Sequence, residues 1–78
     1  MLDAKRVGRA IQRAREEKGV SQEVLSSFAD IGRTHLSAIE CGTRRPTLDT
    51  FFKISEALDM KASDLMKIVE DELQSEDP

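Results

Sequence analysis

Residues 21–42 read SQEVLSSFADIGRTHLSAIECG, a pattern that predicts two short helices joined by a tight turn. Ser21 is a good N-cap for the first helix, because its hydroxyl can accept a backbone N–H of the first turn. This helix should end near Ala29, since residues 30–32, Asp-Ile-Gly, are typical of a turn. Its apolar side is formed by four residues at helical spacing: Val24, Leu25, Phe28 and Ala29.

The second helix of the pair is predicted over 33–41, with Leu36 and Ile39 facing inward. Gly42 follows at the position just past a helix end that glycine favours. The pair therefore spans about 21–41, with three residues between its helices. This is the spacing of a helix-turn-helix motif, whose second helix enters the major groove of DNA with its N-terminus first.

Three more helices are predicted around this pair, so the fold class is all-α. They span about 3–18, 47–58 with Thr47 as N-cap, and 62–73. Their apolar residues follow the helical period: Val7, Ala10, Ile11 and Ala14; Leu48, Phe51, Ile54, Ser55 and Leu58; Leu65, Met66, Ile68, Val69 and Leu73. We expect a compact five-helix bundle, one domain over 1–78, ordered over about 4–73 and with a flexible tail at 74–78.

The chain has a net charge of −3, but its charges are unevenly distributed. Residues 1–45 hold nine Lys or Arg and six Asp or Glu, a balance of +3, whereas residues 46–78 hold three and nine, a balance of −6. This split predicts one face turned toward phosphate and one turned away.

The remaining composition excludes several classes of protein. Cys41 is the only cysteine and His35 the only histidine, so we expect no disulfide, no metal site and no cofactor. No apolar run is long enough for a membrane span, and nothing is typical of a signal peptide. We therefore expect a cytoplasmic protein without a membrane partner and without an evident small-molecule ligand.

Residues 21–25, 31–42 and 44–50 resemble the phage Cro/repressor-type (XRE-like) helix-turn-helix family, and the resemblance covers roughly 7–69. It implies a sequence-specific transcription regulator, either repressor or activator, that binds a palindromic operator in double-stranded DNA as a homodimer. Residues 33–37, Arg-Thr-His-Leu-Ser, are similar to the controller proteins of restriction–modification systems. This narrower resemblance implies regulation of its own promoter and of a neighbouring endonuclease gene. The resemblance is compatible with one dimer or with two dimers bound to one promoter.

The start of the second motif helix carries the candidate base-reading residues. Arg33 has a fork of donors that suits guanine O6 and N7. Thr34 can reach a base edge or a thymine methyl, and Ser37 lies one turn further on the same face. His35 can contact base or backbone, or pack against its own subunit instead. Ala38 stands where relatives often carry a longer side chain, so this position should read little.

Other polar residues are candidates for the phosphate backbone or the minor groove. The resemblance places Gln22 on a phosphate, at a helix N-terminus where unpaired amides favour an anion. Thr43, Arg44 and Arg45 follow the motif in a loop that would lie along the backbone, and either Arg could enter a narrow minor groove. The basic residues of the first helix remain open between phosphate contact and solvent: Arg6, Arg9 and Arg13.

The resemblance also implies an internal ion pair between Arg15 and Glu40, linking the first helix to the third. If this pair is buried, removing one partner leaves an uncompensated charge. We then expect Glu40→Ala to lose folding before it loses specificity. Cys41 stands where relatives commonly carry Arg or Asn, and without a second cysteine we interpret it as an ordinary residue at a helix end.

One helix in one groove makes few contacts, so tight specific binding calls for a two-fold dimer. Phe52 follows Phe51, and two adjacent helix positions cannot both face one core. The same holds for Ile68 and Val69. We therefore predict an isologous interface of five residues, against the alternative that they fill a larger monomer core: Phe52, Leu65, Met66, Ile68 and Val69.

Three alternative functions would require features that can be looked for in the sequence. An enzyme is disfavoured, because the sequence has no carboxylate pair, no nucleophile with a base and no Gly-rich phosphate loop. A protein-interaction adaptor can share the fold, but its recognition helix would lack the basic and polar start that residues 32–34 provide. An antitoxin that represses its own operon would need a toxin-binding segment, for which the short acidic tail is poor material.

Overall fold

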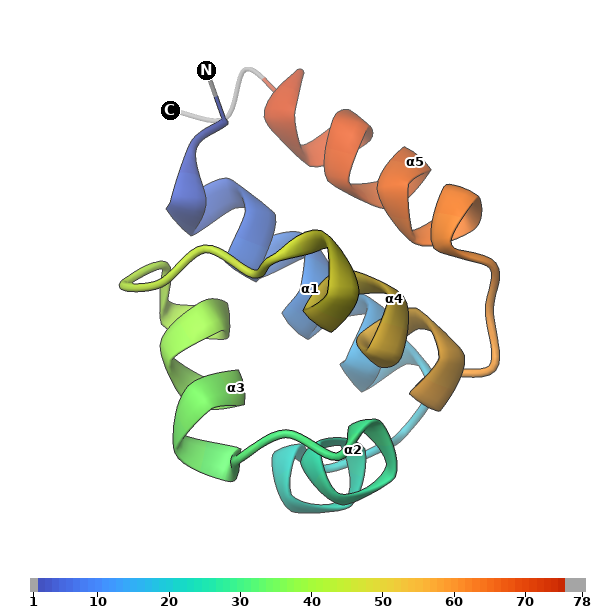
Figure 1. Cartoon of the computed structure of the whole chain (residues 1–78). Coiled ribbons are helices and arrows are strands. Elements are labelled where there is room, and N and C mark those ends of the chain that lie inside the picture. The colour runs from blue at the N-terminus through green and yellow to red at the C-terminus, as the bar shows by residue number, and fades with distance from the viewer. Residues whose placement is uncertain (1, 76–78) are drawn as a thin grey trace.

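Five α-helices follow one another along the chain (Figure 1): α1 (Ala4–Glu17), α2 (Gln22–Ala29), α3 (Arg33–Cys41), α4 (Leu48–Ala57) and α5 (Ala62–Leu73). This computed structural model describes residues 2–75, and none of these residues lies in a strand. The predicted all-α fold is confirmed, and each predicted helix lies within one residue of its observed bounds. None of the described helices has the length and apolar character that crossing a membrane requires. Residues 76–78 of the predicted tail lie outside the described residues.

The helix ends follow from local side-chain chemistry. The Asp3, Ser21 and Thr47 side chains accept backbone N–H groups of the first turns of α1, α2 and α4. Asp30 ends α2 in the left-handed region at φ 57°, which aspartate tolerates better than most residues. Gly42 ends α3 at φ 82°, as its position in the sequence predicts. The turn between α2 and α3 therefore begins at Asp30, and Gly32 caps the start of α3.

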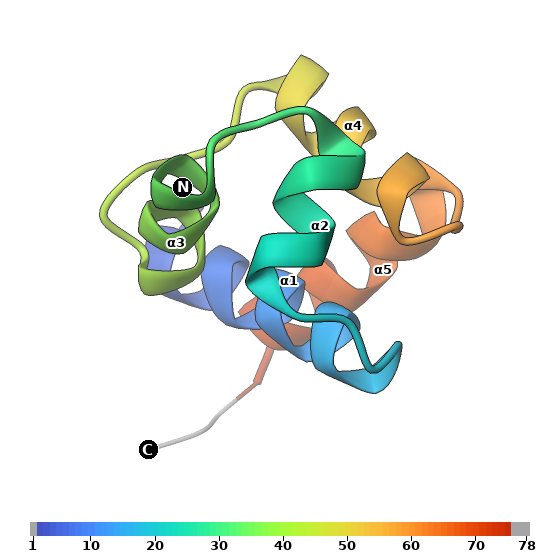
Figure 2. The same cartoon turned by 90° about the horizontal axis from the view of Figure 1, so that it is seen from below.

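Every helix contributes at least one side chain that is wholly buried in a single core, among them Ile11, Leu25, Leu36, Ile54 and Leu65. Helix α1 runs through the middle of the molecule and packs against α3 on one side and α5 on the other (Figures 1 and 2). Helix α2 packs against α3 and α4. This arrangement leaves α3 at the edge of the bundle with one side toward solvent.

Three residues that the sequence pattern places on the apolar sides of their helices are exposed. Val24 is 43% exposed and Phe28 71%, because the inward stripe of the short helix α2 is already filled by Leu25 and Ala29. Each exposed residue lies one position before a buried one, about 100° around the helix. Leu48, at the first position of α4, is 69% exposed. The helical period thus groups Val24, Phe28 and Leu48 with buried residues, although these three side chains lie at the surface.

Gly8 is buried where α1 crosses α3. A Cβ atom built on Gly8 would contact the backbone carbonyl oxygen of Ile39 and would lie 2.6 Å from that of Glu40. Real Cβ atoms essentially never approach this closely, so the crossing requires a residue without a side chain. Gly8 thereby sets how close the two helices approach and where α3 stands.

Three basic residues of α1, Arg6, Arg9 and Arg13, contact the end of α5 and hold it in place. Arg13 Nη1 lies 2.9 Å from Oε2 of the buried Glu72, and Arg9 Nη1 lies 3.4 Å from Glu72 Oε1. Arg6 Nη1 donates to the backbone oxygens of Glu72 and Ser75, at 2.9 and 2.6 Å. These polar contacts join α1 to the C-terminal end of α5.

Candidate nucleic-acid interface

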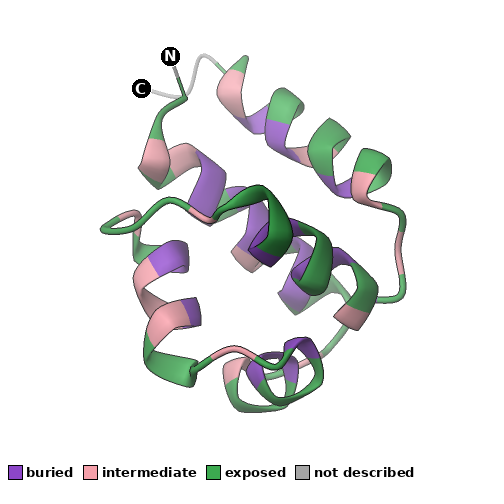
Figure 3. Cartoon of the chain, viewed as in Figure 1, coloured by how far each residue is buried: buried purple, intermediate pink, exposed green. Residues whose placement is uncertain are grey.

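The outer side of α3 carries polar residues, whereas its inner side is buried. Leu36 and Ile39 point into the core, and Arg33 and Thr34 at the start of the helix are exposed. Figure 3 shows this division along α3, with its buried segments facing the bundle. The helix therefore presents a polar face on a rigid support.

A shallow concavity follows this outer side and is lined by seven residues, here called the α3 face: Gln22, Arg33, Thr34, Ser37, Ala38, Cys41 and Thr43. The Arg33, Thr34 and Ser37 side chains form no hydrogen bond or ion pair with another residue in the range 2–75. Their donors are therefore available to an external ligand. His35 is half-buried and does not line this concavity.

Arg15 and Glu40 form a buried ion pair behind the α3 face. Arg15 Nε donates to Glu40 Oε2 at 2.7 Å, and Arg15 Nη2 donates to Glu40 Oε1 at 3.0 Å. This two-point geometry is the one that guanidinium and carboxylate groups favour. Hydrogen bonding to Glu40 raises the pKa of Arg15, against the opposing effect of burial. The pair thus fastens α1 to α3 with both charges retained.

The pair extends to two further groups. Arg15 Nη1 donates to the backbone oxygen of Val20 at 2.8 Å, in the connection between α1 and α2. Gln22 Nε2 donates to Glu40 Oε1 at 2.9 Å, at the start of α2. The predicted phosphate-binding residue therefore already has one partner within the molecule. Nothing in the spacing of Gln22 and Glu40 along the sequence signals this bond.

The loop after α3 uses two of its three predicted DNA contacts within the chain. Thr43 Oγ1 donates to the backbone oxygen of Ala38 at 3.1 Å, which helps to close the end of α3. Arg45 Nη2 donates to the backbone oxygen of Leu2, also at 3.1 Å. Arg44 is exposed, and its side chain has no hydrogen bond or ion pair within the described part of the chain. Arg44 is thus the loop cation with its full set of donors free.

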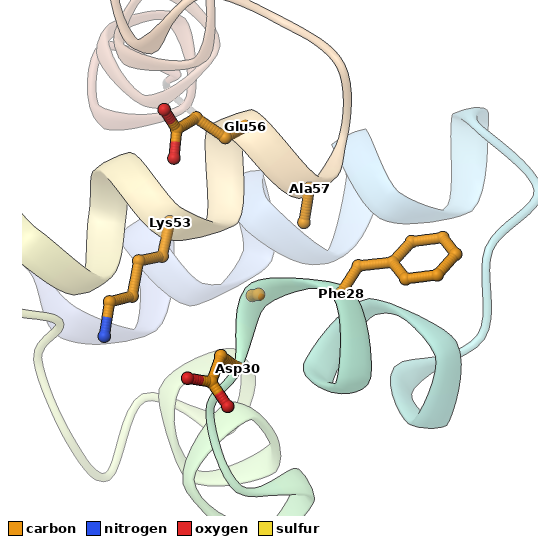
Figure 4. A pocket seen from close by; sticks show the side chains of 6 residues that line it. Phe28, Asp30, Lys53, Glu56 and Ala57 are labelled. Atoms are coloured by element: carbon orange, nitrogen blue, oxygen red, sulfur yellow. The ribbon is translucent and has the colours of Figure 1, made fainter.

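A second hollow lies between the end of α2 and α4, and it differs from the α3 face in its charges. It is lined by Phe28, Ala29, Asp30, Lys53, Glu56 and Ala57. Figure 4 shows that the side chains of Phe28, Lys53 and Glu56 spread away from one another. Two carboxylates beside one ammonium group do not favour an anion. The α3 face is therefore the better candidate for DNA.

No group of three potential metal ligands, whether His, Cys, Asp or Glu, comes together within residues 2–75. Cys41 is exposed as a free thiol at the end of α3.

The predicted dimer interface divides into buried and exposed residues. Leu65 is 0% exposed and Val69 2%, so both belong to the core of the single chain and cannot line an open interface. The reason is that α5 packs this side against α1. Phe52 is 50% exposed and Met66 38%, whereas Ile68 is half-buried against the core. The assignments of Leu65 and Val69 to the interface were therefore wrong.

A largely apolar groove lies beside Met66, and the sequence prediction missed it. Its apolar lining, here called the apolar groove, is Leu2, Val7, Pro46, Leu48, Phe51 and Met66. Leu2 and Leu48 are both more than half exposed. Leu2 precedes the N-cap of α1 and so belongs to no helical period. Leu48 does follow the period of α4, which groups it with the buried residues of that helix rather than with an open groove.

Comparison with known proteins agrees with the helix-turn-helix interpretation of α2 and α3. The helix-turn-helix family matches residues 11–65, well over half of the chain. The chain belongs to the helix-turn-helix family. Control protein C.BamHI of Bacillus amyloliquefaciens is 42% identical over 60 residues, which are 76% of this chain and 74% of that protein.

Solved structures of restriction–modification controller proteins share the fold of this helix-turn-helix protein. C.AhdI from Aeromonas hydrophila has a TM-score of 0.78 at 30% identity, over 81% of this chain and 96% of that one. The C.Esp1396I tetramer bound to its natural 35 base-pair operator has a TM-score of 0.87 at 25% identity, over 96% and 99%. The protein is thus a DNA-binding transcription regulator that resembles the restriction–modification controllers.

Proposed function

We propose that this helix-turn-helix protein is a homodimeric, non-enzymatic regulator that binds an inverted-repeat operator, with α3 of each subunit in a major groove. The observation that carries the proposal is the exposed start of α3, where Arg33 and Thr34 have no partner among residues 2–75. A buried ion pair holds this helix from behind. Rigid support with free donors is what direct base reading requires.

The polar residues of the α3 face and of the loop after it then have distinct roles. Arg33 reads guanine, Thr34 and Ser37 contact neighbouring base edges, and Ala38 leaves room for a methyl group. Gln22 and Arg44 hold phosphates on either side, and these contacts fix the register of the helix without reading sequence. His35, being half-buried, contributes at most at the edge of this surface. The loop residues Thr43 and Arg45 act mainly by shaping the loop that presents Arg44.

The names of the relatives support a proposal about the regulated genes. Relatives such as C.BamHI and C.AhdI are named as control proteins or restriction–modification controllers. We therefore propose that this protein regulates its own promoter and a neighbouring endonuclease gene. A relative binds its natural operator as a tetramer, which supports two dimers on one promoter here. Because its partner is the cell's DNA, we place its action in the cytoplasm. No specific observation on the described residues favours the antitoxin or the adaptor alternative.

The first test selects bound sequences from a random duplex pool, with the parent and Arg33→Ala in parallel. We expect the parent to recover an inverted repeat with a strong guanine preference in each half-site. The variant should recover the same repeat with that preference relaxed, because one two-point Arg–guanine contact contributes about 1–3 kcal/mol of discrimination.

Binding of the parent without any consensus, and abolished by moderate salt, would indicate phosphate contact alone. Recovery of a repeat whose guanine preference is unchanged in Arg33→Ala would leave the function standing and move base reading to other residues. Arg44→Ala is the matched control, since it should weaken all sequences about equally and lower the salt dependence.

The second test concerns the dimer. We propose that Phe52 and the apolar groove form the isologous interface, because Leu48 and Met66 of the groove are exposed and Phe52, also exposed, lies one helical turn after Leu48 on α4. Phe52→Glu should therefore sediment at the monomer mass of 8.7 kDa, at concentrations where the parent is a dimer. An unpaired carboxylate at the centre of an apolar contact should weaken association at least tenfold, or by about 1.4 kcal/mol.

The matched control is Phe28→Glu, the same exchange at a phenylalanine that is 71% exposed on α2. It should leave the dimer intact. A folded Phe52→Glu protein that associates as strongly as the parent would show that the interface lies elsewhere.

A further inference from the structure

Gln22 is the one residue of the α3 face whose side chain is tied to the buried ion pair. Its Nε2 lies 2.9 Å from Glu40 Oε1, and the Glu40 side chain is only 2% exposed. The same oxygen also accepts from Arg15 Nη2 at 3.0 Å. One carboxylate therefore connects α1, α2 and α3 at the back of the candidate DNA-binding surface.

The chemistry of this contact fixes which way the Gln22 amide points. An ionised carboxylate only accepts hydrogen bonds, so the amide must turn its NH2 group toward Glu40. A flipped amide would place its oxygen against the carboxylate oxygens, which is repulsive. Glu40 cannot move to accommodate it, because Arg15 holds both of its oxygens. The orientation thus follows from charge rather than from an arbitrary choice between oxygen and nitrogen.

Gln22 keeps one N–H and its carbonyl oxygen after this bond is made. It is half-buried at the first position of α2 and lines the concavity together with Arg33 and Thr34. A phosphate oxygen can accept the remaining N–H. A side chain already held in place gives up little conformational freedom when the ligand arrives.

We propose that Glu40 is a positioning residue for DNA binding, which orients the Gln22 amide so that its free N–H meets a phosphate of the operator. This inference rests on the proposed function. It gives the Arg15–Glu40 pair a second task besides fastening α1 to α3. The alternative is that the Gln22–Glu40 bond only stabilises the fold and has no effect on bound DNA.

The test removes the orienting carboxylate without leaving an unpaired charge. Arg15→Met with Glu40→Leu replaces the pair by apolar residues of similar size, an exchange that proteins often tolerate without loss of stability. Binding of the selected operator duplex is measured by fluorescence anisotropy for the parent, Gln22→Ala, the double variant and the triple variant. Thermal melting establishes that each variant is folded.

We expect Gln22→Ala to weaken binding about tenfold, the usual size for a hydrogen bond to a charged group. The double variant should lose about as much, and adding Gln22→Ala to it should cost nothing further. A folded double variant that binds as tightly as the parent, while Gln22→Ala still weakens it, overturns the proposal. A silent Gln22→Ala in the parent also overturns it, and Arg33→Ala measured alongside shows whether the proposed function survives.

A second measurement needs no substitution. Nuclear magnetic relaxation of the side-chain amide in the free parent protein should show Gln22 as rigid as the helix backbone. Gln74, which is exposed at the end of α5, is the mobile comparison. A Gln22 amide as mobile as that of Gln74 shows that Glu40 does not orient it, whatever the stability of the double variant.

Discussion

Glu40→Ala is expected to lower the free energy of unfolding by about 3–5 kcal/mol, the usual cost of breaking a buried ion pair by removing one partner. A chain of 78 residues has roughly 4–12 kcal/mol in total, so this loss removes a large part of its stability. The cause is Arg15, whose side chain is 11% exposed and would keep its charge with only the exposed carboxylate of Glu16, at 4.0 Å, beside it. Chemical denaturation followed by circular dichroism measures the effect.

Glu72→Ala is the matched control, because Glu72 is also a buried glutamate with arginine partners. Its partner Arg13 is 53% exposed, so water can solvate that guanidinium once the carboxylate is gone. We expect a loss of about 1 kcal/mol or less. Equal losses for Glu40→Ala and Glu72→Ala would show that the burial of the arginine does not govern the cost.

The ends of the helices could be predicted from the sequence because they depend on neighbouring residues. Ser21 needs only a backbone N–H three residues away, which its hydroxyl accepts at 3.1 Å. Gly42 needs only to reverse the backbone after α3. The apolar period then fixed five helices, and the sequence resemblance supplied the identity of the motif.

The faces of the short helices could not be predicted in the same way. In α2, Val24 and Leu25 are equally apolar, and which one is buried depends on where α3 and α4 lie. In α5, periodicity could not distinguish a residue of the monomer core, such as Leu65, from a residue of the surface, such as Met66. Both errors come from the packing of helices that are distant in sequence.

The partners of the charged residues could not be predicted either, because they are still further apart in the sequence. The basic residues of α1 looked free to bind phosphate, but Arg13 contacts Glu72, which lies 59 residues later. A partner at such a distance leaves no trace in local spacing. The consequence for function is that α1 directs much of its positive charge toward α5. Under the proposed function, DNA binding relies on the few cations of α3 and its loop, chiefly Arg33 and Arg44.

Because few cations are free to contact DNA, the position of α3 is critical. The crossing of α1 and α3 at Gly8 determines that position. Gly8→Ala is expected to lower the free energy of unfolding by about 2–3 kcal/mol, near the upper end for an overpacked core. The added Cβ would contact the carbonyl oxygen of Ile39 and lie 2.6 Å from that of Glu40. Backbone atoms cannot rotate away as a side chain can, so α1 and α3 must separate. The better helix propensity of alanine offsets only about 1 kcal/mol.

The measurement pairs denaturation with operator binding, and Gly32→Ser is the control. A Cβ on Gly32 meets only atoms of His35, at 4.0 Å, and serine is a good N-cap for α3. Its stability should therefore equal or exceed that of the parent. Gly8→Ala should in addition bind the operator more weakly at temperatures where it is still folded, because separation of the helices displaces Glu40 and moves Arg33 out of register. A Gly8→Ala protein as stable as the parent would mean that the α1–α3 crossing adapts to a methyl group, and α3 would then be held by its side chains alone.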